Sequence, residues 1–357
     1  MITPRGATDV DELFVAGQTA LRQGRPAQAA ELFDRVVRHD PDGPFGERGL
    51  FQGALAREAS ADLDAAALRF EELSRRFPTR DRGSEALVRA LRLRLHLEQW
   101  QRADQLGALF LESRPNAAPA GRILAYAGRG LGSLAGGRQE EAEYFVAKGL
   151  QIVDELALDR AGRIPRDLAQ LYFALGETRG KRALGLKLDV PVAAFPAQLE
   201  KRCELLLTAQ SAYSDAMRAY DAHWSAVAGY RVGELYERLH AELMNIPVPA
   251  GKGERQQQLF EGAMRLRYSV LLTKASSMMD HTVMLARRTG EQSAWVRRAE
   301  ASQQKLARAL QDEERAIDRL PFTRQDLQAA MDDLAHRSAE ASASAPAASS
   351  PGPAAPK

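Results

Sequence analysis

The sequence predicts an all-α protein, with repeated helical hairpins in its first part and longer antiparallel helices in its second. Strong helix formers (Ala, Leu, Arg, Glu and Gln) dominate its 357 residues, and β-branched residues are sparse. A motif of small, aromatic and proline residues recurs at a regular interval through the first 150 residues. Later in the chain, apolar residues recur at spacings of three and four, which indicates helices with one packed face.

The clearest copy of the motif lies between Gly17 and Pro41. Gly17 allows the first helix of a hairpin to approach the second closely, and Ala29 stands where the helices cross. Phe33 follows one turn later on the same face and fills the space that these small residues leave. Pro41 ends the second helix, because proline cannot continue a helix. Residues 23–26 are the predicted turn, with a proline suited to the first turn of the second helix.

Further copies follow with decreasing quality. The second and third copies follow at an interval of 37 residues. The third copy lacks the phenylalanine, and Phe110 is expected to fill its place from a neighbouring turn. The fourth copy lacks the closing proline. Regular spacing with a decaying motif is typical of a solenoid whose units have drifted. The structural positions of the repeats are therefore predicted to be Gly17, Ala29, Phe33, Pro41, Ala66, Phe70, Pro78, Ala103, Pro115 and Ala142.

The spacings resemble those of the tetratricopeptide repeat, although Leu13 replaces the aromatic residue usual early in the first helix. The resemblance implies a concave groove, lined by the first helix of each hairpin, that binds a peptide or helix of a protein partner. By register, the groove residues are Phe14, Gln18, Arg48, Phe51, Leu55, Val88 and Arg92.

The residues of this groove favour one kind of ligand. Tetratricopeptide domains that clamp a C-terminal carboxylate use Lys and Asn where Phe14 and Gln18 stand here, so that ligand is disfavoured. An apolar groove with Arg48 and Arg92 at its edge suits a mixed hydrophobic and acidic helix or peptide. The alternative is that these residues pack against the neighbouring repeat or against the C-terminal helices.

The second half is predicted to form longer helices over Arg166–Leu188, Phe195–Tyr220, Trp224–Met244, Glu254–Thr289 and Gln292–Leu320. A short helix to about residue 337 follows a reciprocal capping pattern at Thr323 and Asp326. The last residues are Ala, Ser and Pro with almost no charge, which predicts disorder. The expected organisation is a flexible N-terminus (1–9), repeats (10–160), a long-helix domain that continues the solenoid (161–337) and a disordered tail (338–357).

The C-terminal half carries a second, more diffuse resemblance. The run His223–Glu237, the segment Ile246–Pro249 and Trp295 resemble the C-terminal part of tetratricopeptide proteins of delta-proteobacteria and myxobacteria. Members of that group are linked to cell-envelope machinery, including gliding motility. The resemblance implies an alternative role, in which the long C-terminal helices act in a structural subunit of a bacterial envelope or motility machine.

The composition argues against several other classes. The net charge is only +2, from 49 basic and 47 acidic residues, so nucleic acid is not an expected partner. The sequence shows no secretory signal and no apolar stretch long enough to span a membrane. We therefore expect a cytoplasmic protein as written, with the periplasm or cell envelope as the alternative if the true start lies upstream. The single Cys203 can form neither an internal disulfide nor a Cys-rich zinc site.

No motif predicts catalysis, a metal or a cofactor. The glycines at 128, 130 and 132 lack the preceding β-strand of a dinucleotide loop, so they are interpreted as small residues at a helix crossing. Residues 176–181 fall short of a phosphate loop. Glu237 and His240 share a helix face like half of a di-iron site, but the sequence has no second copy. We expect a non-enzymatic interaction scaffold, with an α-helical enzyme as the least favoured alternative.

Overall fold

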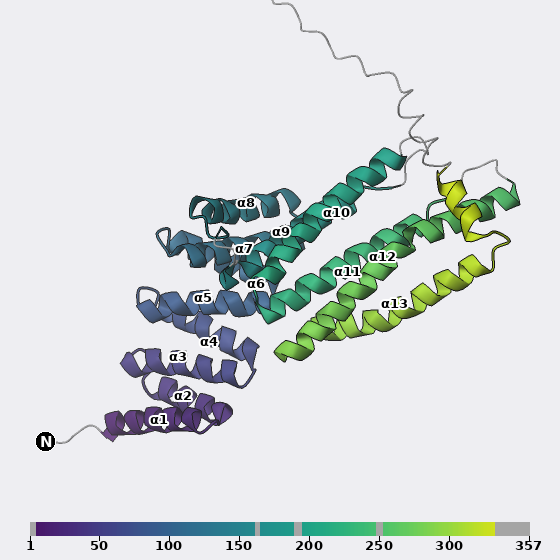
Figure 1. Ribbon diagram of the computed structural model, residues 1–357. Coiled ribbons are helices and arrows are strands. Elements are labelled where there is room, and N and C mark those ends of the chain that lie inside the picture. Colours follow the sequence, from purple (N-terminus) through teal and green to yellow (C-terminus); the bar gives the residue numbers. More distant parts are fainter. Residues whose placement is uncertain (1–4, 161–164, 189–194, 248–252, 333–357) are drawn as a thin grey trace, which may run out of the picture. The chain divides into compact units, whose positions relative to one another are not determined.

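The computed structural model describes residues 5–160, 165–188, 195–247 and 253–332, and no β-strand lies within these ranges (Figure 1). The predicted all-α fold is confirmed. The chain forms two compact units. The repeat unit comprises residues 1–178 and 215–224, and the long-helix unit comprises residues 179–214 and 225–357. The predicted tail (338–357) lies outside the described residues.

The repeat unit contains hairpins that follow one another along the chain, as the motif predicts. Each helix packs against the next one, and α1, α3 and α5 also contact one another in sequence. The helix α1 begins at Arg5, which is earlier than the expected start at residue 10. The hairpins are α1 (Arg5–Arg22) with α2 (Pro26–His39), α3 (Pro44–Ala59) with α4 (Leu63–Arg76), α5 (Asp81–His96) with α6 (Trp100–Ser113), and α7 (Pro119–Ala135) with α8 (Gln139–Glu155).

The turn within each hairpin contains one residue in the left-handed conformation. Gly24, Ala61, Glu98 and Gly137 have φ values of 70°, 60°, 58° and 78°. Glycine adopts this conformation without strain, whereas a residue with a Cβ atom costs about 1–2 kcal/mol there. The same turn geometry is therefore kept at Ala61 and Glu98 against local preference, because the packed helices on either side determine it.

The core of each early hairpin repeats the same aromatic pair. The rings of Phe14 and Phe33 meet edge to face with centroids 5.4 Å apart, and those of Phe51 and Phe70 do so at 5.9 Å. A Cβ atom on Gly17 would lie 2.8 Å from the Phe33 ring, so glycine is required for this approach. The alanine and phenylalanine positions of the motif have no exposed surface at Ala29, Phe33, Ala66, Phe70, Ala103 and Ala142. The closing prolines Pro41, Pro78 and Pro115 follow the ends of α2, α4 and α6.

The third hairpin replaces the aromatic pair with direct backbone packing. Gly107 stands where Phe33 and Phe70 stand in the earlier copies, and a Cβ atom there would lie 2.7 Å from the Ala125 carbonyl oxygen of α7. Phe110 is buried and packs against Gly121, also in α7.

The glycines of α7 pack on two sides of that helix. A Cβ atom on Gly128 or Gly132 would meet α6, at the carbonyl oxygens of Ala103 and Trp100, whereas one on Gly130 would meet Val146 of α8. These glycines are thus small residues at helix crossings, as the sequence predicts. They do not form a nucleotide loop.

The repeat unit extends past the predicted boundary at residue 160. The short 3₁₀ helix η1 (Arg166–Leu168) leads into α9 (Ala169–Gly185), whose first residues belong to this unit. A Cβ atom on Gly149 of α8 would lie 2.6 Å from Leu171, so α9 packs closely on α8. The loss of the motif after Pro165 indicates a change in helix length, and the packing continues beyond it.

The remaining helices are long. They are α10 (Phe195–Arg218), α11 (Ala222–Met244), α12 (Glu254–Thr289) and α13 (Ala294–Asp318), and residues 324–332 are also helical. Leu272 and Met279 of α12 form a buried cluster with Ala299 and Leu306 of α13. Gly290, with φ of 75°, ends α12 in the left-handed conformation. The capping pattern is confirmed, since Thr323 and Asp326 exchange backbone-to-side-chain hydrogen bonds of 2.9 and 3.2 Å.

Candidate partner-binding surface

A carboxylate on the second helix of each of the first three hairpins is held by two arginines of the next hairpin. We call these sets the inter-repeat clamps. The carboxylates belong to Asp34, Glu71 and Asp104. One arginine comes from the first helix of the next hairpin (Arg57, Arg94 and Arg129), and the other comes from its second helix or the residue before it (Arg69, Arg102 and Arg138).

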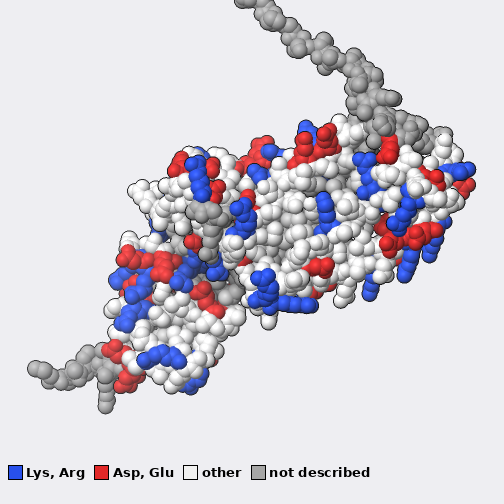
Figure 2. Space-filling view, in the orientation of Figure 1, with Lys and Arg blue, Asp and Glu red and all other residues white. Residues whose placement is uncertain are grey.

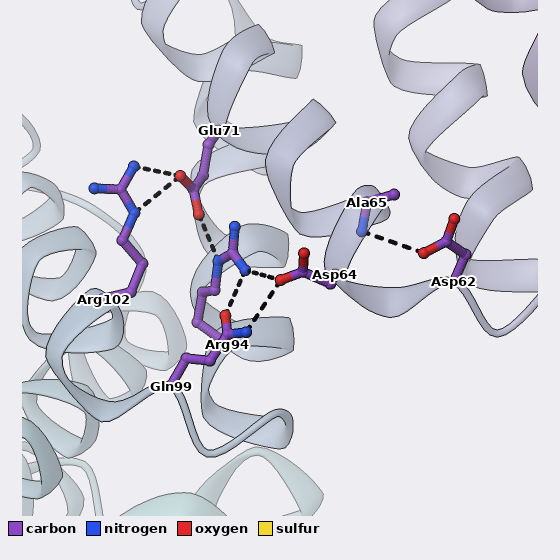
Figure 3. A network of polar contacts seen from close by, with 7 residues as sticks. All are labelled: Asp62, Asp64, Ala65, Glu71, Arg94, Gln99 and Arg102. Atoms are coloured by element: carbon purple, nitrogen blue, oxygen red, sulfur yellow. Dashed lines mark hydrogen bonds and ion pairs between the residues drawn. The ribbon is translucent and has the colours of Figure 1, made fainter.

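The middle clamp is the most buried. Figure 3 shows Glu71 between Arg94 and Arg102, and the Nε atom of Arg94 donates to Glu71 at 2.6 Å. Arg94 also donates to Asp64 at 2.5 Å, and Gln99 donates to the same Asp64 oxygen at 3.0 Å. Hydrogen bonds from Gln99 and Arg94 lower the pKa of Asp64. The side chains of Arg94 and Glu71 are 5% and 8% exposed, so little water competes for this pair.

The clamps fix each hairpin to the next. Each arginine side chain reaches across the boundary between two repeats, in addition to the apolar packing of adjacent helices. Figure 2 shows acidic and basic side chains side by side over the region of α3 to α5. Residues on the first helices are therefore held in a constant register along the repeat unit, which keeps a binding surface pre-organised.

Six of the seven predicted groove residues, all except Arg48, fall into two rows with different surroundings. Phe14, Phe51 and Val88 form what we call the inner row, and Gln18, Leu55 and Arg92 form the outer row. Within each row, successive members are 37 residues apart. Phe14 is only 3% exposed and packs against Phe33 and Phe45. The prediction that Phe14 lines an open groove is wrong, because its ring pairs with Phe33 in the core of the hairpin.

The other inner-row residues are half-buried. The ring of Phe51 packs edge to face on Phe70, and Val88 keeps part of its surface open to solvent. Arg48 stands over the ring of Phe14, with 4.2 Å from its guanidinium carbon to the ring centroid, and it also lies near Phe45. A guanidinium over an aromatic face is held by the charge distribution of the ring. Arg48 therefore covers the aromatic core and offers only one edge to a ligand.

The outer row faces solvent. Gln18 is exposed, Leu55 is half-buried, and the Arg92 side chain is 48% exposed. Arg92 donates to Asp167 at 3.2 Å, and the Asp167 side chain is itself 56% exposed. An ion pair this exposed contributes only about 0–1 kcal/mol. An acidic group of a partner can replace Asp167 at low cost, whereas Phe14 of the inner row is packed in the core.

Glu237 and His240 do not form a metal site with their neighbours. Glu237 pairs with Lys305, and the His240 Nε2 atom lies 3.8 Å from an oxygen of Glu313. Among the described residues, no cluster of His, Cys, Asp and Glu is suited to hold a metal ion. A shallow surface depression is lined by Glu254, Arg255, Gln258 and Pro321. Within the described part of the chain, no helix combines the length and apolar character needed to cross a membrane.

Comparisons with known proteins add one similarity. No protein-family model matches the chain, and no curated protein matches it. Among solved structures, the chain is similar to a tetratricopeptide repeat protein from Parabacteroides merdae ATCC 43184, with 11% sequence identity and a TM-score of 0.40. The similarity covers 92% of this chain and 99% of that one. The hairpins and their 37-residue register define this chain as an all-α helical-repeat protein.

The inter-repeat clamps are absent from the predictions made from the sequence. The signal was present, because Arg57 and Arg94, like Asp34 and Glu71, are 37 residues apart. A charged pair that recurs in register on adjacent repeats indicates a contact between them. The third clamp breaks the interval, since Asp104 and Arg129 fall elsewhere in the repeat.

Proposed function

We propose that this protein is a non-enzymatic scaffold whose repeat unit binds a peptide or helix of a protein partner along the outer row. The observation that carries the proposal is the exposure of Gln18 and Arg92, with a half-buried Leu55 between them, at the same position of three successive first helices. The clamps support it, because they hold that row in register before a partner arrives.

The chemistry of the outer row favours a mixed hydrophobic and acidic segment. Leu55 offers an apolar contact, Gln18 offers an amide that both donates and accepts, and Arg92 offers a guanidinium. The half-buried Val88 and Phe51 extend the apolar part beside the row. An extended or helical segment with acidic residues near Arg92 fits this order of groups.

Affinity purification with outer-row variants tests the proposal. The double variant Leu55→Lys and Arg92→Glu changes the row without touching the aromatic core. The matched control is Leu68→Lys with Arg75→Glu, which alters exposed positions of α4 with the same charge changes. We expect wild type and control to retain the same partner and the outer-row variant to lose it, with unchanged circular dichroism. Equal recovery by all three proteins contradicts the proposal.

A second role follows from the sequence resemblance to envelope and motility proteins. In this alternative proposal, the protein is a structural subunit that acts through its long C-terminal helices. The cytoplasmic location, with the envelope as the alternative, stays a prediction that cell fractionation tests.

A further inference from the structure

One face of α12 has seven exposed residues at alternating spacings of three and four, which we call the basic stripe. Its members are Arg267, Val270, Lys274, Ser277, His281, Met284 and Arg288. The buried face of the same helix follows Leu272, Ala275, Met279, Thr282 and Ala286. Five of the stripe positions follow these buried positions by two residues, and two residues turn a helix through about 200°. The basic stripe therefore lies opposite the core.

The charge of this face has a single sign. Between Gly262 and Thr289 the sequence contains one acidic residue, Asp280, and its carboxylate accepts a 2.6 Å hydrogen bond from Gln303 of α13. Val270 and Met284 on the stripe are 49% and 57% exposed. A merely solvated helix face usually mixes both signs and shows few large apolar residues.

Neighbouring helices show that ordinary pattern. The exposed residues of α13 carry charges of both signs, among them Arg297, Glu300, Lys305, Arg308, Asp312 and Glu314. On α10 the exposed face similarly includes Glu200, Lys201 and Glu204. The basic stripe thus differs from these two faces in the sign of its charge.

We propose that the basic stripe docks an acidic amphipathic helix of a protein partner. Alternating spacings of three and four are those at which one helix packs along another. Arg267, Lys274 and Arg288 would face Glu or Asp of the partner, while Val270 and Met284 receive its apolar side chains. The stripe spans about 32 Å at 1.5 Å per residue, which corresponds to about three heptads of a partner helix.

Two other occupants fit less well. A second copy of α12 would bring the Arg and Lys side chains of two stripes together, and these like charges repel. A lipid surface needs a continuous apolar face on the helix, and only Val270 and Met284 are apolar here. This surface lies in the long-helix unit, so it goes beyond the outer row of the repeat unit.

A defined peptide tests the proposal on the full chain. The probe is a synthetic three-heptad helical peptide with Glu and Leu on one face, and its binding is measured by fluorescence anisotropy. The stripe variant combines Arg267→Glu, Lys274→Glu and Arg288→Glu. The matched control combines Arg297→Glu, Arg308→Glu and Arg319→Glu, which changes the net charge equally at exposed positions outside the stripe.

We expect wild type and control to bind the peptide and the stripe variant to bind at least tenfold more weakly. A peptide with Lys in place of Glu should bind the stripe variant better than wild type. Equal weakening in the control would show a net-charge effect and overturn the proposal, as would no binding by wild type. Stripe-dependent binding to phosphatidylglycerol vesicles without peptide binding would also overturn it. The outer-row variant should bind the peptide normally, which separates this result from the proposed function.

Discussion

His240 shows at the scale of a single residue how burial and charge compete. The imidazole is buried, and its Nε2 atom has no hydrogen-bond partner among the described residues. One oxygen of Glu313 lies 3.8 Å from that atom, while the other accepts a 2.8 Å hydrogen bond from Arg265. Burial lowers the pKa of His240, the charge of Glu313 opposes this, and Arg265 adds to it, so the pKa stays below its ordinary value.

This lowered pKa predicts a loss of stability in mild acid. Because the unfolded chain binds a proton on His240 at higher pH than the folded chain, stability falls as the pH drops below about 6.5. Hydrogen exchange of peptides from α11, α12 and α13 should accelerate between pH 7 and pH 5.5, after correction for intrinsic rates. The variant His240→Gln should lose this acid-dependent part. A pH response identical to that of wild type would contradict the assignment to His240.

Gly107 shows what sequence reasoning predicts at this scale and what it cannot. The motif correctly places small residues at helix crossings, because their spacing follows from helix geometry. The absence of phenylalanine at position 107 appears in the sequence as decay of the motif. In the structure the position is filled by the Ala125 carbonyl of α7. The identity of the group that fills such a space depends on how the next helix is placed, and a local motif does not contain that information.

The inter-repeat clamps matter at the scale of elements, since they join helices of adjacent hairpins. Each clamp adds charge-assisted hydrogen bonds to apolar packing. A buried ion pair gives little net stability relative to an apolar pair, but removal of one partner leaves the other charge buried. The clamps therefore act mainly by making any other register between two hairpins unfavourable.

Removal of one clamp carboxylate should destabilise the repeat unit strongly. The variant Glu71→Gln leaves Arg94 with only Asp64 and Gln99, so we expect a loss of about 2–4 kcal/mol in the free energy of unfolding. Asp42→Asn is the control, because the Asp42 side chain is 91% exposed and its pair with Arg76 contributes about 0–1 kcal/mol. Urea unfolding followed by circular dichroism measures both. Similar losses in the two variants would show that burial of the clamp is unimportant.

The sequence predicts the ends of the helices better than the strained backbone conformations of the turns between them. Prolines follow the ends of α2, α4 and α6, and these ends depend on local chemistry. Ala61 and Glu98 adopt left-handed turns that their own preferences oppose. Because tertiary packing imposes such conformations, they cannot be predicted from the residues of the turn alone.

At the scale of the whole molecule, the repeat unit includes a segment that lies far along the chain. The unit boundaries fall within α9, α10 and α11, at Thr178, Asp215 and Trp224. In the repeat unit, Asp221 accepts a 2.9 Å hydrogen bond from Arg166, and the Trp224 ring packs on Phe173. Residues 215–224 are therefore part of the repeat unit although they lie far along the chain.

A comparison of fragments tests this division. The fragment 1–224 contains every residue of the repeat unit, whereas 1–160 ends at the boundary predicted from sequence and lacks Leu171, Phe173 and Trp224. We expect 1–224 to unfold at a higher urea concentration than 1–160, because the shorter fragment exposes apolar surface of α8. Circular dichroism at 222 nm follows both transitions. Equal midpoints would place the boundary at residue 160.

The central claim is that a protein partner lies along the outer row, and site-specific photo-crosslinking in living cells tests it most directly. A photoreactive amino acid replaces Gln18 or Leu55 on the outer row, and Glu31 on α2 serves as the control position. The account predicts the same crosslinked protein from both outer-row positions and its absence from the control. No adduct at either outer-row position, or the same adduct at all three, would contradict it.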